Sequence, residues 1–155
     1  MNNTNINIFA QEVITRLKNY KKKGIIRDIH KLSVKEGRKE FKKIRNFFAN
    51  QENDKVLWAK DIVLNKVSVR YYRGKNNSEK DILPVMLFFH GGGWVLGDLD
   101  THDQVCRKLV NDAKYDVLSI DYSLAPESVF PKAIEECASI LKYLVQKENL
   151  LKIDS

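Results

Sequence analysis

Hydrophobic residues recur at helical spacing in two segments near the N-terminus. Residues 5–20 place apolar side chains on one face of an amphipathic helix, at Ile6, Phe9, Val13, Ile14 and Leu17. The lysines and the glycine of residues 21–24 are typical of its C-terminal end. The second segment begins at Ser33, which forms an S-x-x-E capping box with Glu36. The pattern predicts a second helix that fades near residue 50.

Strand-like patterns follow from residue 56 onward. Residues 56–64 and 67–71 alternate between apolar and polar positions, which predicts two strands joined by a turn at Asn65 and Lys66. A continuous apolar run over residues 83–89 predicts a strand that is covered on both faces.

The rest of the chain alternates helices with one further strand. A T-x-x-Q capping box at Thr101 predicts a helix, and residues 117–121 predict the next strand. Pro131 suits the first turn of a last helix, and residues 150–155 are expected to form only a connector. This order of elements predicts an α/β fold with parallel central strands.

Charge is distributed unevenly over the 155 residues, which carry a net charge of +7. Residues 1–60 hold 15 lysines and arginines against 6 acidic residues, whereas residues 61–155 hold 12 against 14. The basic segment leaves open a module that binds nucleic acid or an anionic membrane surface. Since no nucleic-acid motif accompanies it, we expect a solvated lysine-rich face and no nucleic-acid partner.

Several function classes are disfavoured by what the sequence lacks. It does not open with a basic stretch followed by an apolar one, and its longest apolar run is too short to span a bilayer, so we expect a cytoplasmic protein. Cys106 and Cys137 have no C-x-x-C pattern and no histidine cluster nearby. We therefore expect buried, reduced thiols and no metal site.

The motif His90-Gly91-Gly92-Gly93-Trp94 directly follows the apolar run of residues 83–89. Glycine has no Cβ, so consecutive glycines at a strand end let the backbone bend and approach a ligand closely. Backbone N–H groups presented in this way stabilise the oxyanion that develops in acyl transfer. Gly91, Gly92 and Gly93 are therefore candidates for an oxyanion hole, and no cofactor is expected.

Two further motifs extend this pattern, Gly97-Asp98-Leu99-Asp100-Thr101-His102 and Asp121-Tyr122-Ser123-Leu124-Ala125-Pro126-Glu127. Together with the glycine motif they resemble the hormone-sensitive-lipase-like branch of the α/β-hydrolases (α/β-hydrolase fold-3), which includes many bacterial carboxylesterases. The second motif of that family has arginine where this chain has Ser123.

The resemblance implies an incomplete α/β-hydrolase sheet, with the first four strands and two flanking helices, preceded by a two-helix cap. It divides the chain into a helical cap segment, residues 1–52, and the N-terminal half of the core, residues 53–155, truncated before the nucleophile elbow. It also implies that Gly92 and Gly93 donate to the oxyanion.

The resemblance assigns supporting roles to residues around the glycines. His90 is expected to set the glycine loop, and Trp94 to form pocket wall or core. Asp121, Tyr122 and Glu127 are expected to organise the second loop. His102 is expected to be a solvated or capping histidine.

The catalytic triad of the family runs Ser, Asp or Glu, and His along the chain. Here no serine lies between glycines, and no histidine follows His102. We therefore expect the N-terminal portion of a serine carboxylic-ester hydrolase (esterase or lipase) for small carboxylic esters, catalytically incompetent by itself. The alternatives are a non-catalytic remnant or subunit completed by a partner chain, and the basic binding module. An apolar strand at residues 83–89 without a fifth strand beside it also favours a complementary C-terminal chain or self-association.

Overall fold

The computed structural model describes residues 8–48, 54–112, 114–146 and 153–154. Three helical elements come first: α1 (Ile8–Lys22), the 3-10 turn η1 (Ile29–Lys31) and α2 (Val34–Phe48). The predicted capping box is present, since the Ser33 hydroxyl donates to Glu36 Oε2 over 2.6 Å. Both N-terminal helices thus lie where the hydrophobic periodicity predicts them.

A five-stranded sheet of order β1-β2-β4-β3-β5 forms the core. Its strands are β1 (Trp58–Leu64), β2 (Val67–Arg73), β3 (Leu83–Phe89), β4 (Asp116–Ile120) and β5 (Ile153–Asp154). β1 and β4 both pair antiparallel to β2, whereas β3 is parallel to β4 and to β5. The predicted turn at Asn65 and Lys66 closes the β1–β2 hairpin, with φ of 45° and 69°. The parallel central strands of the sequence prediction are confirmed.

The last residues correct one expectation. Residues 150–155 were expected to be only a connector, but Ile153 and Asp154 pair with Leu83 and Pro84 of β3. β3 therefore has a short neighbour at its N-terminal end, on the side away from β4.

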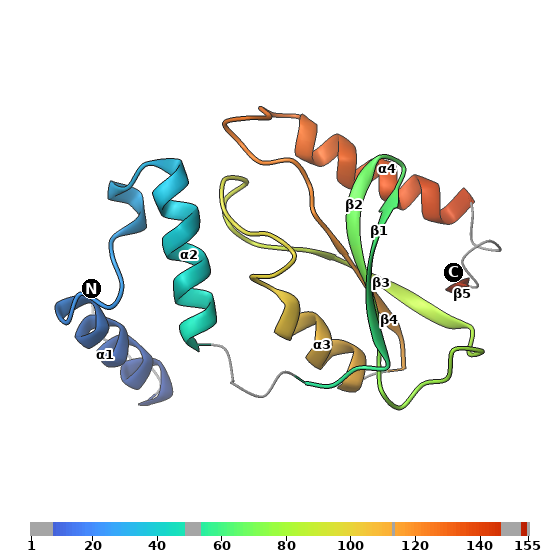
Figure 1. Ribbon diagram of the computed structural model, residues 1–155, viewed down its shortest axis with the longest axis horizontal. Coiled ribbons are helices and arrows are strands. Elements are labelled where there is room, and N and C mark those ends of the chain that lie inside the picture. The colour runs from blue at the N-terminus through green and yellow to red at the C-terminus, as the bar shows by residue number, and fades with distance from the viewer. Residues whose placement is uncertain (1–7, 49–53, 113, 147–152, 155) are drawn as a thin grey trace.

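Two helices cover opposite faces of the sheet, α3 (Asp103–Asp112) and α4 (Lys132–Gln146) (Figure 1). The larger core cluster lies on the α4 side and consists of Leu64, Val67, Val69, Leu118, Ile120, Tyr122, Ile140 and Leu144. The smaller cluster lies on the α3 side and consists of Tyr72, Cys106, Val110 and Val117. Because β4 contributes to both clusters, all five of its residues are buried.

α3 begins at Asp103, two residues after the predicted capping position. The Thr101 hydroxyl donates to the Asp98 carbonyl over 2.9 Å and accepts from the Asp98 N–H, also over 2.9 Å. This threonine therefore closes the turn that precedes the helix.

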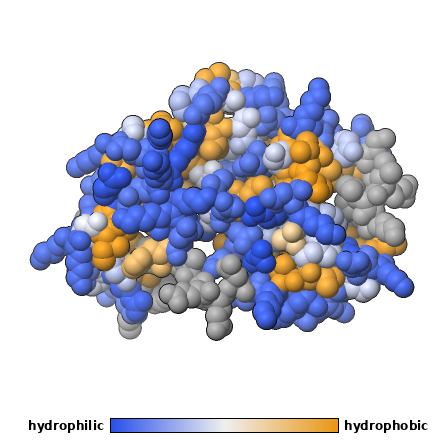
Figure 2. All heavy atoms as spheres, in the orientation of Figure 1, coloured by the Kyte–Doolittle hydropathy of each residue, from blue (hydrophilic) through white to orange (hydrophobic). Residues whose placement is uncertain are grey.

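β3 is less covered than its apolar sequence predicts, which is a second correction. Met86 and Phe89 are 37% and 46% exposed. α4 also leaves apolar side chains in solvent, namely Ile134, Leu141 and Val145. Figure 2 shows apolar patches of this kind between the charged side chains on one face of the molecule.

No helix of the described segments has the length and apolarity needed to cross a membrane.

α2 lies beside the loops that follow β3 (Figure 1). Lys42 Nζ donates to Asp100 Oδ2 over 2.7 Å, and Arg45 Nε donates to the Thr101 carbonyl over 3.0 Å. α2 is thus attached to the core through the segment between β3 and α3.

Candidate oxyanion site

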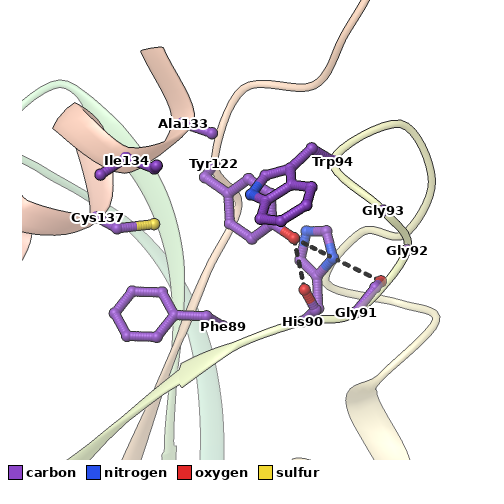
Figure 3. A pocket seen from close by; sticks show the side chains of 10 residues that line it. All are labelled: Phe89, His90, Gly91, Gly92, Gly93, Trp94, Tyr122, Ala133, Ile134 and Cys137. Carbon is purple, nitrogen blue, oxygen red and sulfur yellow. Dashed lines mark hydrogen bonds between the residues drawn. The ribbon is translucent and has the colours of Figure 1, made fainter. Parts of the chain in front are cut away.

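The glycine motif forms the loop at the C-terminal end of β3, where it borders a pocket of about 370 Å³ (Figure 3). The lining residues are Phe89, His90, Gly91, Gly92, Gly93, Trp94, Tyr122, Ala133, Ile134 and Cys137. The carboxyl ends of β3 and β4 and the first turns of α4 therefore meet at the glycines. Most of the lining is apolar, which suits the carbon chain of a small ligand.

The three glycines meet different steric conditions. At Gly92 φ is +142°, and a Cβ would lie 1.9 Å from the Leu96 carbonyl oxygen. At Gly93 φ is +63°, but no atom lies within 4 Å of a Cβ position. Gly91 has equally open surroundings and a φ outside the left-handed region. Gly92 therefore requires glycine for space and for conformation, Gly93 for conformation alone, and Gly91 for neither.

A tight turn holds the motif in place. The Gly92 carbonyl accepts hydrogen bonds from Val95 N and Leu96 N over 3.3 and 2.9 Å. The N–H groups of Gly91, Gly92 and Gly93 donate to no other described residue. Gly91 and Gly93 are exposed and Gly92 is half-exposed, so the turn that carries these N–H groups is accessible from solvent.

His90 is buried beneath the glycines, with 3% of its surface exposed. Its ring stacks on Tyr122 at a centroid distance of 4.3 Å, and the Tyr122 hydroxyl donates to the His90 carbonyl (Figure 3). A Cβ at Gly97 would lie 2.4 Å from His90 Nδ1, so Gly97 lets the chain pass closely over this ring. These contacts fit the predicted role of His90 in setting the glycine loop, and they join that loop to Tyr122 of the second motif.

His102 is half-buried, so its side chain is less solvated than one of the two sequence expectations, a solvated or capping histidine, would have it. Its ring lies 5.6 Å from that of His90, 5.9 Å from that of Phe88 and 6.4 Å from that of Phe41, between centroids. Burial, with smaller contributions from Arg45 and His90, lowers the pKa of His102 to about 4. The imidazole is therefore neutral at physiological pH.

Trp94 and Glu127 join the glycine loop to the second motif. Trp94 is 61% exposed and lines the pocket, so it is pocket wall and not core. Its carbonyl accepts from the Ala125 N–H over 2.8 Å. Glu127 accepts two hydrogen bonds from Arg38, at 2.8 and 2.7 Å, and this pairing lowers the pKa of its carboxyl to about 2.

The remaining residues of the second motif are placed around β4. The Asp121 N–H donates to the Ser68 carbonyl over 3.0 Å, and the Asp121 side chain bonds to no residue that the structure describes. Ser123, the departure from the family motif, donates to Glu136 of α4 through its N–H and its hydroxyl, over 2.7 and 2.9 Å. Ser123 thus ties the motif to the first turns of α4.

The sequence placed Arg38 only in the basic N-terminal segment and did not connect it to the second motif. Arg38 lies 89 positions from Glu127 in the chain, and no local pattern connects the two residues. The signal that could have identified it is its position on the face of α2 that also carries Lys42 and Arg45.

Neither cysteine thiol is activated in its surroundings. Burial raises the pKa of the Cys106 thiol to about 11 and also raises that of Cys137, which lines the pocket. Both thiols are free, and both are protonated at neutral pH. Within the described ranges, no group of three or more His, Cys, Asp and Glu side chains could hold a metal ion.

Comparison of the sequence with known proteins gives consistent matches. A family profile described as alpha/beta hydrolase fold matches residues 86–155. The ethyl acetate hydrolase of Pseudomonas putida is 31% identical over 137 residues, which is 85% of this chain and 43% of that protein. Carboxylic ester hydrolase LipN of Mycobacterium tuberculosis is 49% identical over 71 residues, which is 46% of this chain and 18% of that protein.

Solved structures give the same result. The ester hydrolase EH1AB1 from the metagenome of Lake Arreo superposes with a TM-score of 0.81 and 26% identity, over 92% of this chain and 46% of that one. An esterase of Pyrobaculum calidifontis superposes with a TM-score of 0.79 and 28% identity, over 97% of this chain and 46% of that one. The chain thus spans less than half the length of these relatives.

Proposed function

Because the chain belongs to the hormone-sensitive-lipase-like branch of the α/β-hydrolase family, we propose that it is the N-terminal portion of a serine carboxylic-ester hydrolase. In this proposal residues 1–52 form the cap, and residues 53–155 form the N-terminal half of the core. Gly92 and Gly93 donate their N–H groups to the oxyanion of the tetrahedral intermediate. His90, Trp94, Asp121, Tyr122 and Glu127 hold the two loops that surround it.

One observation carries this proposal. The N–H groups of consecutive glycines at the carboxyl end of a central strand donate to no described residue, and they border an apolar pocket. A buried backbone N–H almost always has a protein partner, whereas these glycines are exposed or half-exposed, so their N–H groups are open to solvent or to a ligand. N–H groups left unpaired at a pocket are therefore available to an anionic reaction centre. The pocket suits the carbon chain of a short- or medium-chain ester, and the reaction needs neither cofactor nor metal.

The energetics limit what this chain does without further residues. One oxyanion donor contributes roughly 3 kcal/mol to transition-state stabilisation, whereas enzymes typically lower the barrier by about 8 kcal/mol or more. We expect no hydrolysis above background from residues 1–155 alone. Nucleophile, acid and base must then come from a complementary C-terminal segment, in the same chain or in a partner.

A chimera tests the proposal. Residues 1–155 replace the matching N-terminal part of the Lake Arreo ester hydrolase, and hydrolysis of p-nitrophenyl acetate is measured. We expect the chimera to be active and Gly92→Ala to lower its kcat by about a hundredfold or more. Glu79→Gln, in the exposed loop before β3, is the matched control and should leave kcat unchanged.

Besides a chimera that folds but is inactive, two results would contradict the proposal. One is brisk hydrolysis by the isolated 155 residues together with labelling by a serine-directed phosphonate. The other is a chimera that the phosphonate labels and in which Gly92→Ala hydrolyses the ester as fast as the parent.

A further inference from the structure

The glycine turn has few contacts of its own that could fix its orientation. A Cβ at Gly91 or Gly93 would touch nothing within 4 Å, so the chain around these positions is loosely surrounded. The direction of the glycine N–H groups therefore depends on the residues that follow, where the turn closes with bonds from Val95 N and Leu96 N to the Gly92 carbonyl. A contact that fixes the carbonyl groups of residues 94–95 therefore also fixes the direction of the glycine N–H groups.

Arg38 of α2 contacts the turn at this point. Its Nε donates to the Val95 carbonyl over 2.9 Å, and its Nη2 donates to the Ala125 carbonyl over 3.0 Å. The Ala125 N–H in turn donates to the Trp94 carbonyl over 2.8 Å. One guanidinium thus joins the cap helix, the glycine turn and the second motif.

Glu127 orients this guanidinium. Its carboxylate accepts from Nη1 and Nη2, which fixes the plane of the fork and directs the remaining donors toward the two carbonyls. A lysine ammonium could not reproduce this arrangement, because it is a point charge without a planar fork.

We propose that Arg38 is a positioning residue for the oxyanion turn: by holding the Val95 carbonyl it fixes the direction of the Gly92 and Gly93 N–H groups. This inference rests on the proposed function, since the donors matter only if an oxyanion forms beside them. Arg38 itself touches neither the pocket nor the reacting atoms.

A second cation of α2, Lys42, makes it possible to distinguish positioning of the glycine turn from simple attachment of α2 to the core. Lys42 also ties α2 to the core, through Asp100, but it does not contact residues 92–96. Lys42→Gln therefore weakens the attachment of α2 and leaves the turn alone, which makes it the matched control for Arg38→Gln.

The first experiment measures amide hydrogen exchange, residue by residue, in the 155-residue chain. We expect Arg38→Gln to accelerate exchange at Val95 and Leu96 by roughly tenfold to a hundredfold, the effect of losing a charged hydrogen bond. In Arg38→Lys, exchange at these two amides should be accelerated to a similar extent. In Lys42→Gln, their exchange rates should match those of the parent. Val117 and Leu118 in β4 report on the fold and should be unchanged throughout.

Three results would overturn the inference. Parent-like exchange in Arg38→Gln would show that the turn does not need the guanidinium. Equal acceleration in Lys42→Gln would show that Arg38 only attaches the helix. Acceleration that extends to Val117 and Leu118 would show that Arg38 serves the whole fold.

The second experiment separates this inference from the proposed function. In an active chimera, Arg38→Gln should lower kcat about tenfold or more with KM nearly unchanged, because the interaction it supports forms only in the transition state. An active chimera whose kcat does not respond to Arg38→Gln overturns the positioning role alone. An inactive chimera contradicts the proposed function, while the exchange measurement still decides whether Arg38 holds the turn.

Discussion

The consecutive glycines of the turn should differ sharply in their tolerance of alanine, with Gly92 the most sensitive. Alanine at Gly92 would have to adopt a φ of +142° and place a Cβ 1.9 Å from the Leu96 carbonyl oxygen and 2.4 Å from the Leu96 carbonyl carbon. Both are backbone atoms, so relief requires the turn to open and the 2.9 Å bond from Leu96 N to the Gly92 carbonyl to break.

The expected loss is the sum of two effects. A non-glycine residue in such a backbone region costs about 1–3 kcal/mol, and a lost hydrogen bond costs about 1 kcal/mol. Gly92→Ala should therefore reduce the free energy of unfolding by about 2–4 kcal/mol. Gly93→Ala meets only the left-handed φ and should cost about 1–2 kcal/mol. Gly91→Ala meets neither obstacle and should stay within about 0.5 kcal/mol of the parent.

Urea unfolding of the three variants, followed by circular dichroism, measures this order. Thermal unfolding should agree, with a fall in Tm of about 4–16 °C for Gly92→Ala. Equal losses at Gly91 and Gly92, or a larger loss at Gly91, would refute the reasoning. The differences in φ and in space around the Cβ position, on which the order of the three glycines rests, would then be wrong.

Three shorter predictions concern the rest of the fold. Asp116 is fully buried and accepts from Arg73 over 2.6 Å, so Asp116→Asn should cost about 3–5 kcal/mol in urea unfolding, whereas exposed Asp61→Asn should cost less than about 1 kcal/mol. The pKa of His102 is lowered from 6.5 to about 4, so between these values the unfolded chain binds a proton that the folded chain does not. Stability should therefore fall as the pH falls from 6.5 to 4, and His102→Phe should flatten that dependence. Leu141 is 53% exposed on α4, together with Ile134 and Val145, and Leu141→Lys should lower the apparent mass of the chain in sedimentation at fixed concentration, because it removes apolar surface that favours self-association.

Local patterns in the sequence were sufficient to locate most elements. The continuous apolar run predicted β3 at residues 83–89, which are its observed bounds, and the Ser33 capping box marked the start of α2. Both signals act between residues within a few positions of each other, so they are readable from the chain alone. The glycine motif likewise located the candidate site at a strand end.

Contacts between distant segments could not be predicted in this way. Periodicity shows which face of a helix or strand is apolar but not what that face meets, which is why β3 was expected to be covered on both sides. The environment of His102 depends on rings from α2, β3 and the glycine motif, which converge only in the folded chain. The repeated glycines also look equivalent in the sequence, whereas only the backbone geometry separates their requirements.

The basic N-terminal segment shows why net charge alone is a weak guide to partners. Arg38, Lys42 and Arg45 follow one another at helical spacing on α2, and each bonds to the loops of the core. These cations were expected to form a solvated face, or in the alternative interpretation to bind a polyanion. A cation already held by a carboxylate or a carbonyl must first give up that bond before it contacts a phosphate, so its contribution to such binding is reduced. Arg38, Lys42 and Arg45 are therefore better explained as the means by which α2 attaches to the loops of the core than as a surface for nucleic acid.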